Sequence, residues 1–218
     1  MLKKLLKRVW KNEEGITGLE TAIILIAFVV VAAVFAYTVL SAGLFATQKS
    51  QESVYSGLKE AQASLELRGG IIATANTTGA SGYVKQISFV VSNALGGEAI
   101  DFTTPSTGNH TGTAASGSSN KVVIDYVDQN QHINNLYWTI DDLGSSDNDS
   151  LLEANEKFQI TIGSDTAGTG AGNFMDCLAS PYLTTNQKFT LVVRTPVGAV
   201  LEIERTTPAY IDHIMNLH

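Results

Sequence analysis

Residues 21–48 read TAIILIAFVVVAAVFAYTVLSAGLFATQ, a run of 28 residues without a charged side chain. At a rise of about 1.5 Å per residue, a helix of this length spans ~42 Å and can cross the ~30 Å hydrocarbon core of a bilayer. The run is apolar on every side, so it has no polar face to turn toward water. No turn residue that would separate several buried strands occurs before Gly43. We therefore predict a helix that lies in lipid or is enclosed by other helices.

Basic residues precede the apolar run. Residues 1–15 carry a net charge of +3, whereas the remainder of the chain carries −10. The lysine and arginine bias predicts that the N-terminal flank stays in the cytoplasm and that the long C-terminal part lies outside. The apolar run is about twice as long as the hydrophobic part of a secretory signal peptide, and no A-x-A site closes it, so conventional secretory cleavage is disfavoured.

The helical pattern continues beyond the apolar run. Val54, Leu58, Ala61 and Leu65 recur at spacings of three and four residues, which places them on one face of a helix. Gly69 and Gly70 then end the pattern, as a helix C-cap does. We predict a helix over residues 16–68, apolar to about residue 48 and amphipathic after it. A helix of this length, against an average of about 11–12 residues, indicates assembly along its length.

Composition excludes several classes of function. The 218-residue chain has a formal net charge of −7, which removes the basic face that a nucleic-acid binder needs. A single cysteine, Cys177, makes neither an internal disulfide nor a thiolate zinc site. The four histidines show no metalloprotease spacing, and no nucleophile elbow or phosphate loop occurs. We predict a protein that is not an enzyme, has no cofactor and does not bind nucleic acid.

Residues 70–218 change to short alternating runs separated by clusters of Gly, Ser, Thr, Asn and Pro. Alternation of apolar and polar residues is typical of strands with one buried face. About seven such runs predict an antiparallel β-sandwich and, together with the helix, an α+β fold. The predicted strands are IIATA (71–75), YVKQISFVVSN (83–93), KVVIDYV (121–127), NLYWTI (135–140), EKFQITI (156–162), KFTLVV (188–193) and AVLEIER (199–205).

Residues 141–153 form an acidic stretch that contains five carboxylates, including those of Asp141 and Asp142. Oxygen ligands at this density suit Ca²⁺, and Asp147, Asp149 and Glu153 are the candidate ligands. The EF-hand pattern fails, because the loop lacks its glycine and places Leu151 at a ligand position. A solvated acidic loop is the alternative interpretation.

Three N-x-S/T sequons lie in the predicted outer domain, at Asn76, Asn109 and Asn148. All three fall in turn-rich stretches, where a bulky glycan finds room on the surface. We predict N-glycosylation at one or more of them.

The junction of leader and helix, residues 14–23, reads EGITGLETAI, and with the apolar run that follows it resembles the archaeal flagellins, or archaellins. The resemblance implies a class III signal peptide, residues 1–15, that a prepilin-type peptidase cuts between Gly15 and Ile16. It also implies that residues 70–218 form an immunoglobulin-like sandwich, and N-glycosylation is common in the family. In the related type IV pilins a matching glutamate is associated with the amine of a neighbouring subunit. This suggests that Glu20 pairs with the new N-terminus at Ile16 of its own or an adjacent chain.

The same resemblance implies the function. The chain is expected to be inserted transiently in the cytoplasmic membrane and then to polymerise with other archaellins into an extracellular helical filament for swimming. Its expected partners include the archaellum assembly and motor machinery. Two alternatives stay open: a type IV pilin-like adhesion filament, and a single-pass membrane anchor that carries an extracellular β-domain.

Overall fold

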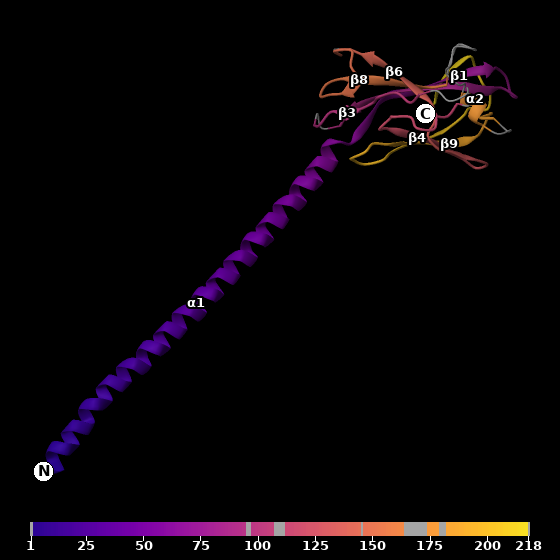
Figure 1. Cartoon of the computed structure of the whole chain (residues 1–218). Coiled ribbons are helices and arrows are strands. Elements are labelled where there is room, and N and C mark those ends of the chain that lie inside the picture. Colours follow the sequence, from indigo (N-terminus) through magenta and orange to yellow (C-terminus); the bar gives the residue numbers. More distant parts are fainter. Residues whose placement is uncertain are drawn as a thin grey trace. The chain divides into compact units, whose positions relative to one another are not determined.

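The computed structural model describes residues 2–94, 97–106, 112–144, 146–163, 174–178 and 182–217, with side chains described from residue 18 onward except at 175 and 176. The chain divides into two compact units, residues 1–55 and 56–218. The first unit is helical, and the second contains all of the strands (Figure 1). The elements are α1 (Leu2–Gln62), β1 (Leu65–Thr77), β2 (Tyr83–Asn93), β3 (Ile100–Asp101), β4 (Val123–Asp128), β5 (His132–Ile133), β6 (Trp138–Leu143), β7 (Leu151–Leu152), β8 (Lys157–Ile162), α2 (Phe174–Cys177), β9 (Lys188–Arg194), β10 (Leu201–Thr206) and β11 (Ile214–Leu217).

The α+β fold predicted from the sequence is confirmed, but α1 ends at Gln62, six residues before the predicted end. A hydrogen bond from the Ala63 N–H to the Lys59 carbonyl (3.1 Å) closes its last turn, and the Ser64 hydroxyl caps the Glu60 carbonyl (3.1 Å). Residues 65–68, LELR, fit two patterns: the apolar residues alternate as in a strand, and Leu65 also continues the helical spacing. In the structure these residues pair with β2. Tertiary pairing therefore decides an ambiguous local sequence in favour of a strand.

Gly69 and Gly70 do not cap a helix, so this interpretation of the sequence was wrong. Both lie inside β1, where the pairing with β2 shifts register between Arg68 and Ile72. Gly69 has φ +84°, and a Cβ on Gly70 would lie 2.4 Å from the side chain of Asn216. Glycine is thus favoured at position 69 by the positive φ of the bulge, and at position 70 it leaves room for the side chain of Asn216 on β11.

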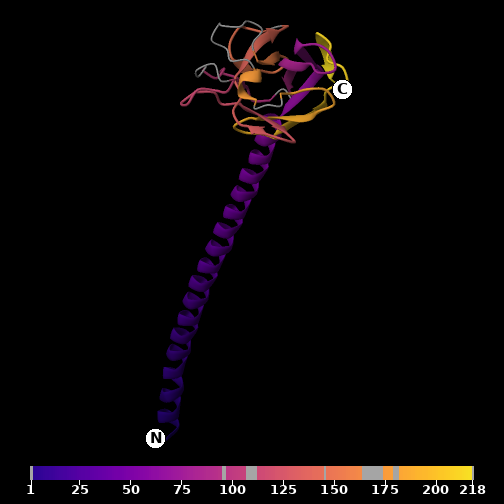
Figure 2. The ribbon, with the colours of Figure 1, turned by 90° about the vertical axis from the view of Figure 1, so that its right-hand side faces the viewer.

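Two antiparallel sheets build the sandwich. One has the strand order β11-β1-β2-β8-β6 and the other β10-β9-β4-β5, while β3 and β7 form a separate two-stranded ladder. All seven predicted strands are present, and β2 has the predicted bounds. The last strand, β11, is an edge strand of the five-stranded sheet, so the chain ends on the sandwich (Figure 2).

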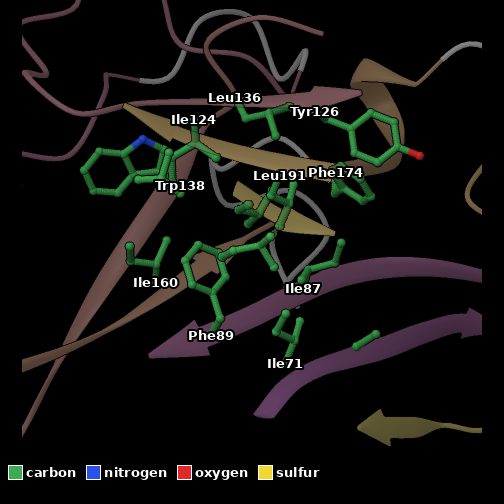
Figure 3. Packing of buried hydrophobic residues seen from close by; sticks show 14 of the residues in the cluster. Ile71, Ile87, Phe89, Ile124, Tyr126, Leu136, Trp138, Ile160, Phe174 and Leu191 are labelled. Carbon is green, nitrogen blue, oxygen red and sulfur yellow. The ribbon is translucent and has the colours of Figure 1, made fainter. Parts of the chain in front are cut away.

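The core lies between the two sheets (Figure 3). Alternate residues of facing strands point into it, as the period-two patterns predicted. Trp138 and Phe158 pack edge to face against Phe102, with ring centroids 5.9 and 5.7 Å away. Tyr126 packs in the same way against Phe174 at 5.2 Å. These rings belong to one continuous cluster of buried residues.

Candidate functional site

The surface of α1 is the largest feature of the chain that internal packing leaves unexplained. Every residue from 18 to 61 is exposed, although this range contains the apolar run. Side chains such as Phe28 (74 % exposed) and Val31 (67 %) lie all round the helix rather than along one stripe. The predicted stripe residues Val54 and Leu58 are exposed as well. A surface of this size requires cover from outside the chain.

The three threonine hydroxyls within the apolar run are satisfied by carbonyl oxygens of the helix itself. The hydroxyl of Thr38 donates to the carbonyl of Phe35 (2.8 Å), and that of Thr47 donates to the carbonyl of Gly43 (2.9 Å). Thr21 donates in the same way to Gly18 (3.0 Å). Hydroxyls satisfied inside their own helix are tolerated in lipid and between packed helices. By length and composition, residues Gly18–Gln62 contain a helix able to span a membrane.

Gly15, Ile16 and Glu20 lie on α1. The backbone of Gly15 and Ile16 is helical, whereas their side chains fall outside the described part of the chain. Glu20 is exposed, one turn after Ile16. Cleavage after Gly15 and pairing between Ile16 and Glu20 stay predictions.

The sequons differ in their surroundings. Asn76 is exposed near the end of β1, where its side-chain amide donates to the hydroxyl of Tyr83 (3.0 Å). Asn148 is exposed in a turn with φ +68°. Asn109 lies outside the described residues. Glycosylation at these three sites stays a prediction.

The acidic loop shows its carboxylates bound to the local backbone. Asp147 accepts a hydrogen bond from the N–H of Asp149 (3.3 Å), and Asp149 accepts one from the N–H of Leu151 (2.6 Å). Glu153 is exposed. Among the described residues, no group of three or more His, Cys, Asp or Glu side chains could hold a metal ion. The calcium prediction therefore gains no support from the geometry.

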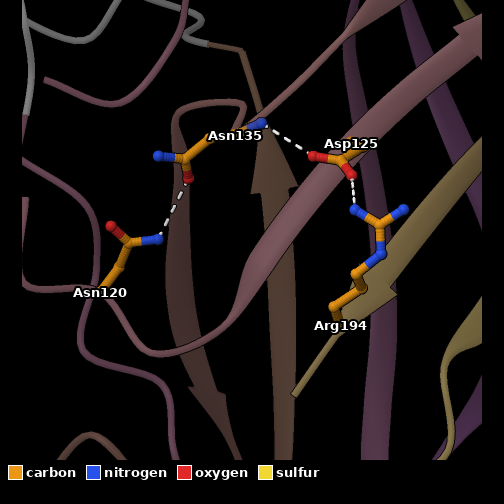
Figure 4. A network of polar contacts seen from close by, with 4 residues as sticks. All are labelled: Asn120, Asp125, Asn135 and Arg194. Carbon is orange, nitrogen blue, oxygen red and sulfur yellow. Dashed lines mark hydrogen bonds and ion pairs between the residues drawn. The ribbon is translucent and has the colours of Figure 1, made fainter. Parts of the chain in front are cut away.

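A polar network that the sequence did not predict surrounds one buried carboxylate of the four-stranded sheet (Figure 4). The carboxylate of Asp125 on β4, 1 % exposed, forms an ion pair with Arg194 on β9 and accepts the N–H of Asn135 (2.9 Å). The Asn135 side chain in turn accepts from Asn120 (3.1 Å). The sequence signal for this network was Asp125, the single charged residue inside the apolar run VVIDYV (122–127).

A second hub surrounds Asp128 at the end of β4. It accepts hydrogen bonds from the Tyr126 hydroxyl (2.7 Å), the Gln131 N–H (2.8 Å) and the Gln187 side chain (3.0 Å). Burial works against the charged carboxylate, but the bonds from Tyr126, Asn130 and Gln131 outweigh it and hold the pKa of Asp128 below its ordinary value. Burial, followed by the contact with Asp128, raises the pKa of Tyr126. These bonds fix a turn and supply no reactive group.

Together these features define a class of protein: a β-sandwich carried on a long helix whose apolar surface must be covered by other molecules. The sequence model of the archaeal-type flagellin family matches residues 15–205, and the chain belongs to that family. It is accordingly a structural filament subunit and not an enzyme, as the sequence predicted, and the filament of such subunits is extracellular.

Relatives and solved structures agree with the family. Probable flagellins 1 and 2 of Archaeoglobus fulgidus are each 38 % identical to this chain; the first match covers 96 % of this chain and 98 % of the relative, and the second 93 % of both. A solved structure of the archaeal flagellum of Methanospirillum hungatei has a TM-score of 0.57 at 29 % identity, covering 92 % of this chain and 98 % of that one. Flagellin FlaB1 of Methanocaldococcus jannaschii (TM-score 0.50, 10 % identity, 71 % and 96 % covered) is similar in fold. Of the three functions left open by the sequence, these matches support the flagellar filament subunit.

Proposed function

We propose that the chain is made as a membrane-held precursor, is cut between Gly15 and Ile16, and polymerises through α1 into the core of a swimming filament. The exposed apolar surface of α1 carries this proposal, since nothing in the described chain covers it. Neighbouring copies of the same helix supply the cover. Filament contacts of this kind are heterologous and do not close into a ring.

The route through the membrane follows from the energetics of α1. Fully burying one Val, Leu, Ile or Phe side chain from water contributes about 1.5–3 kcal/mol, so the apolar run is not stable in water. Lipid and a bundle of apolar helices are nearly equivalent surroundings, because neither exposes the side chains to water. The membrane thus serves as the reservoir from which the assembly machinery draws subunits, and a motor in the membrane turns the finished filament.

Removal of the leader, residues 1–15, allows a subunit to leave the membrane. Its net charge of +3 favours the orientation with the N-terminus in the cytoplasm and the sandwich outside. Cleavage by a prepilin-type peptidase removes this charge and leaves a free amine on Ile16. Glu20 lies four residues later on the same helical face, so its carboxylate pairs with that amine in its own or an adjacent subunit. A carboxylate enclosed among apolar helices is costly unless it is paired in this way.

The outer surface of the filament carries N-linked glycans in this proposal. Asn76 and Asn148 support it, because both are exposed on the sandwich. Asn109 is proposed from its sequon alone.

N-terminal sequencing and intact-mass measurement of sheared surface filaments test the proposal. The expected N-terminus is Ile16, with excess mass on peptides that contain Asn76, Asn109 or Asn148. An intact Met1 on a protein confined to membranes would overturn it. Glu20→Gln should abolish or shorten filaments, whereas Glu52→Gln, which changes an exposed glutamate paired with Lys49 (2.6 Å), serves as the matched control and should not.

A further inference from the structure

The sequon at Asn76 lies on a β-bulge. Ala75 pairs with Val84 and Thr77 pairs with Tyr83, so Asn76 is the extra residue between two ladder pairs. The extra residue of a bulge is left unpaired, and bulges re-aim side chains at the edge of a ladder. The exposed amide of Asn76 is thereby brought to the Tyr83 hydroxyl, at 3.0 Å.

The turn after the bulge is held on two sides. Gly79 and Ile211 exchange backbone hydrogen bonds of 2.9 and 3.1 Å. On the other side, the Thr185 hydroxyl donates to the carbonyl of Ala80 (3.2 Å). A further bond, from Val84 to the carbonyl of Leu183 (3.0 Å), ties the segment after Tyr182 to the start of β2. The turn that follows the sequon is therefore anchored to the segments around Leu183 and Ile211.

The Tyr83 hydroxyl accepts a hydrogen bond from the Asn76 amide, and the ring of Tyr182 lies next to the ring of Tyr83. Tyr83 and Tyr182 have ring centroids 5.1 Å apart and planes inclined at 35°. Tyr182 retains 37 % of its exposure, and Tyr83 is half-buried. Partly exposed tyrosines offer an apolar, electron-rich ring face together with a hydroxyl that donates and accepts hydrogen bonds. This combination suits a sugar ring, which presents an apolar C–H face and hydroxyl groups.

We propose that Tyr83 and Tyr182 form a binding platform for the first sugar of a glycan attached to Asn76. The inference rests on the glycosylation included in the proposed function. The pyranose ring packs its C–H face on the exposed part of the tyrosine pair, and the glycan is ordered along the surface instead of moving freely.

The chemistry of attachment uses one of the two N–H donors of the Asn76 amide. The Nδ2 atom of Asn76 forms a bond to C1 of the sugar, and the bond from C1 to the phosphate of a lipid-phosphate-linked sugar donor breaks. The phosphate keeps the electron pair, and the proton that Nδ2 gives up passes through solvent to the leaving phosphate. One N–H of Nδ2 remains as a hydrogen-bond donor, because the amide carries two donors before the reaction.

Nitration of tyrosines by tetranitromethane tests the platform. We compare wild-type protein with Thr78→Ala, which destroys the sequon but keeps Asn76, and with Thr78→Ser, which preserves the sequon. Thr78 is exposed, so neither change disturbs the core. Tyr182 should react roughly two- to tenfold faster in Thr78→Ala than in wild type or Thr78→Ser, the range expected for one aromatic stacking contact.

Ser150→Ala removes the second described sequon and serves as the matched control. Within the described residues, no hydrogen bond joins the Asn148 side chain to a tyrosine, so this change should leave the reactivity of Tyr182 unaltered. Nitration of both sheared filaments and detergent-dispersed subunits separates shielding by the sugar from shielding by neighbouring subunits.

The outcomes separate the platform from the filament assignment. Equal nitration of Tyr182 with and without a glycan on Asn76, or an Asn76 that mass spectrometry finds unmodified in wild-type filaments, would overturn the platform while leaving the filament subunit intact. Loss of filaments together with an uncut Met1 in wild type would instead overturn the proposed function.

Discussion

The guanidinium of Arg194 on β9 forms an ion pair with the carboxylate of Asp125 on β4, and that carboxylate is 1 % exposed (Figure 4). The same carboxylate accepts the N–H of Asn135, a residue held at φ +52°. One buried charge thus joins two neighbouring strands to the loop that leads into β6.

Asp125→Ala should lower the free energy of unfolding by about 1–3 kcal/mol, because it leaves the Asn135 N–H without its acceptor, whereas the half-exposed Arg194 can be hydrated. Urea denaturation of the dispersed chain, followed by the fluorescence of buried Trp138, measures the change. Lys188→Ala breaks the Lys188–Glu204 pair (2.8 Å), in which both side chains are more than half exposed, and should cost less than about 1 kcal/mol. Equal effects of the two substitutions would contradict the structural role of Asp125.

Acid should weaken the sandwich through Asp128. Hydrogen bonds hold its folded-state pKa below the ordinary value, so its contribution is complete above the unfolded pKa of about 3.9 and is lost as the pH falls through the lower folded pKa. Asp128→Asn should flatten the dependence of the urea midpoint on pH below about 4. Part of the slope should persist, because the hydrogen bond from the Thr103 side chain likewise lowers the pKa of Asp101. An unchanged slope in Asp128→Asn would refute this account.

Gly198 should tolerate no side chain. Its φ is +115°, and a Cβ would lie 2.3 Å from the carbonyl oxygen of Ala63, just after the end of α1. Gly198→Ala should therefore cost more than the roughly 1–2 kcal/mol of left-handed backbone strain and should open the peptide around Ala63 to proteases. Gly117 has φ +84° and open space around it. Gly117→Ala therefore measures the backbone strain without a steric clash. Similar unfolding midpoints for the two variants would argue against close packing of Gly198 on the Ala63 carbonyl.

A charge in the middle of α1 should abolish assembly. Val30→Asp places a carboxylate among apolar helices, at a cost of about 2.5–3.5 kcal/mol per subunit on the membrane-insertion scale. Electron microscopy of cell surfaces and motility in soft agar give the readout. Gln51→Asp introduces the same side chain beyond the apolar run and should preserve filaments. Normal filaments from Val30→Asp would place the interface elsewhere.

Local sequence predicted the strands where period-two alternation was unambiguous. The run YVKQISFVVSN became β2 with its predicted bounds, because its apolar residues serve one buried face. The four-residue strand β11 was missed, since its two buried residues, Met215 and Leu217, are too few to establish a period without β1 as a partner. Leu65 and Leu67 fitted both a helix and a strand, and pairing with β2 decided between them.

The sequence alone determined that α1 is a helix without a partner in its own chain, because 28 uncharged residues cannot stay in water and offer no turn at which to fold back. It also determined the apolar positions of the sandwich, since burial requires alternation along each strand. Only the tertiary structure brought Asp125 to Arg194 and the ring of Tyr182 to that of Tyr83. These contacts join residues 69 and 99 positions apart, and the local alternation of residues does not specify which strands become neighbours.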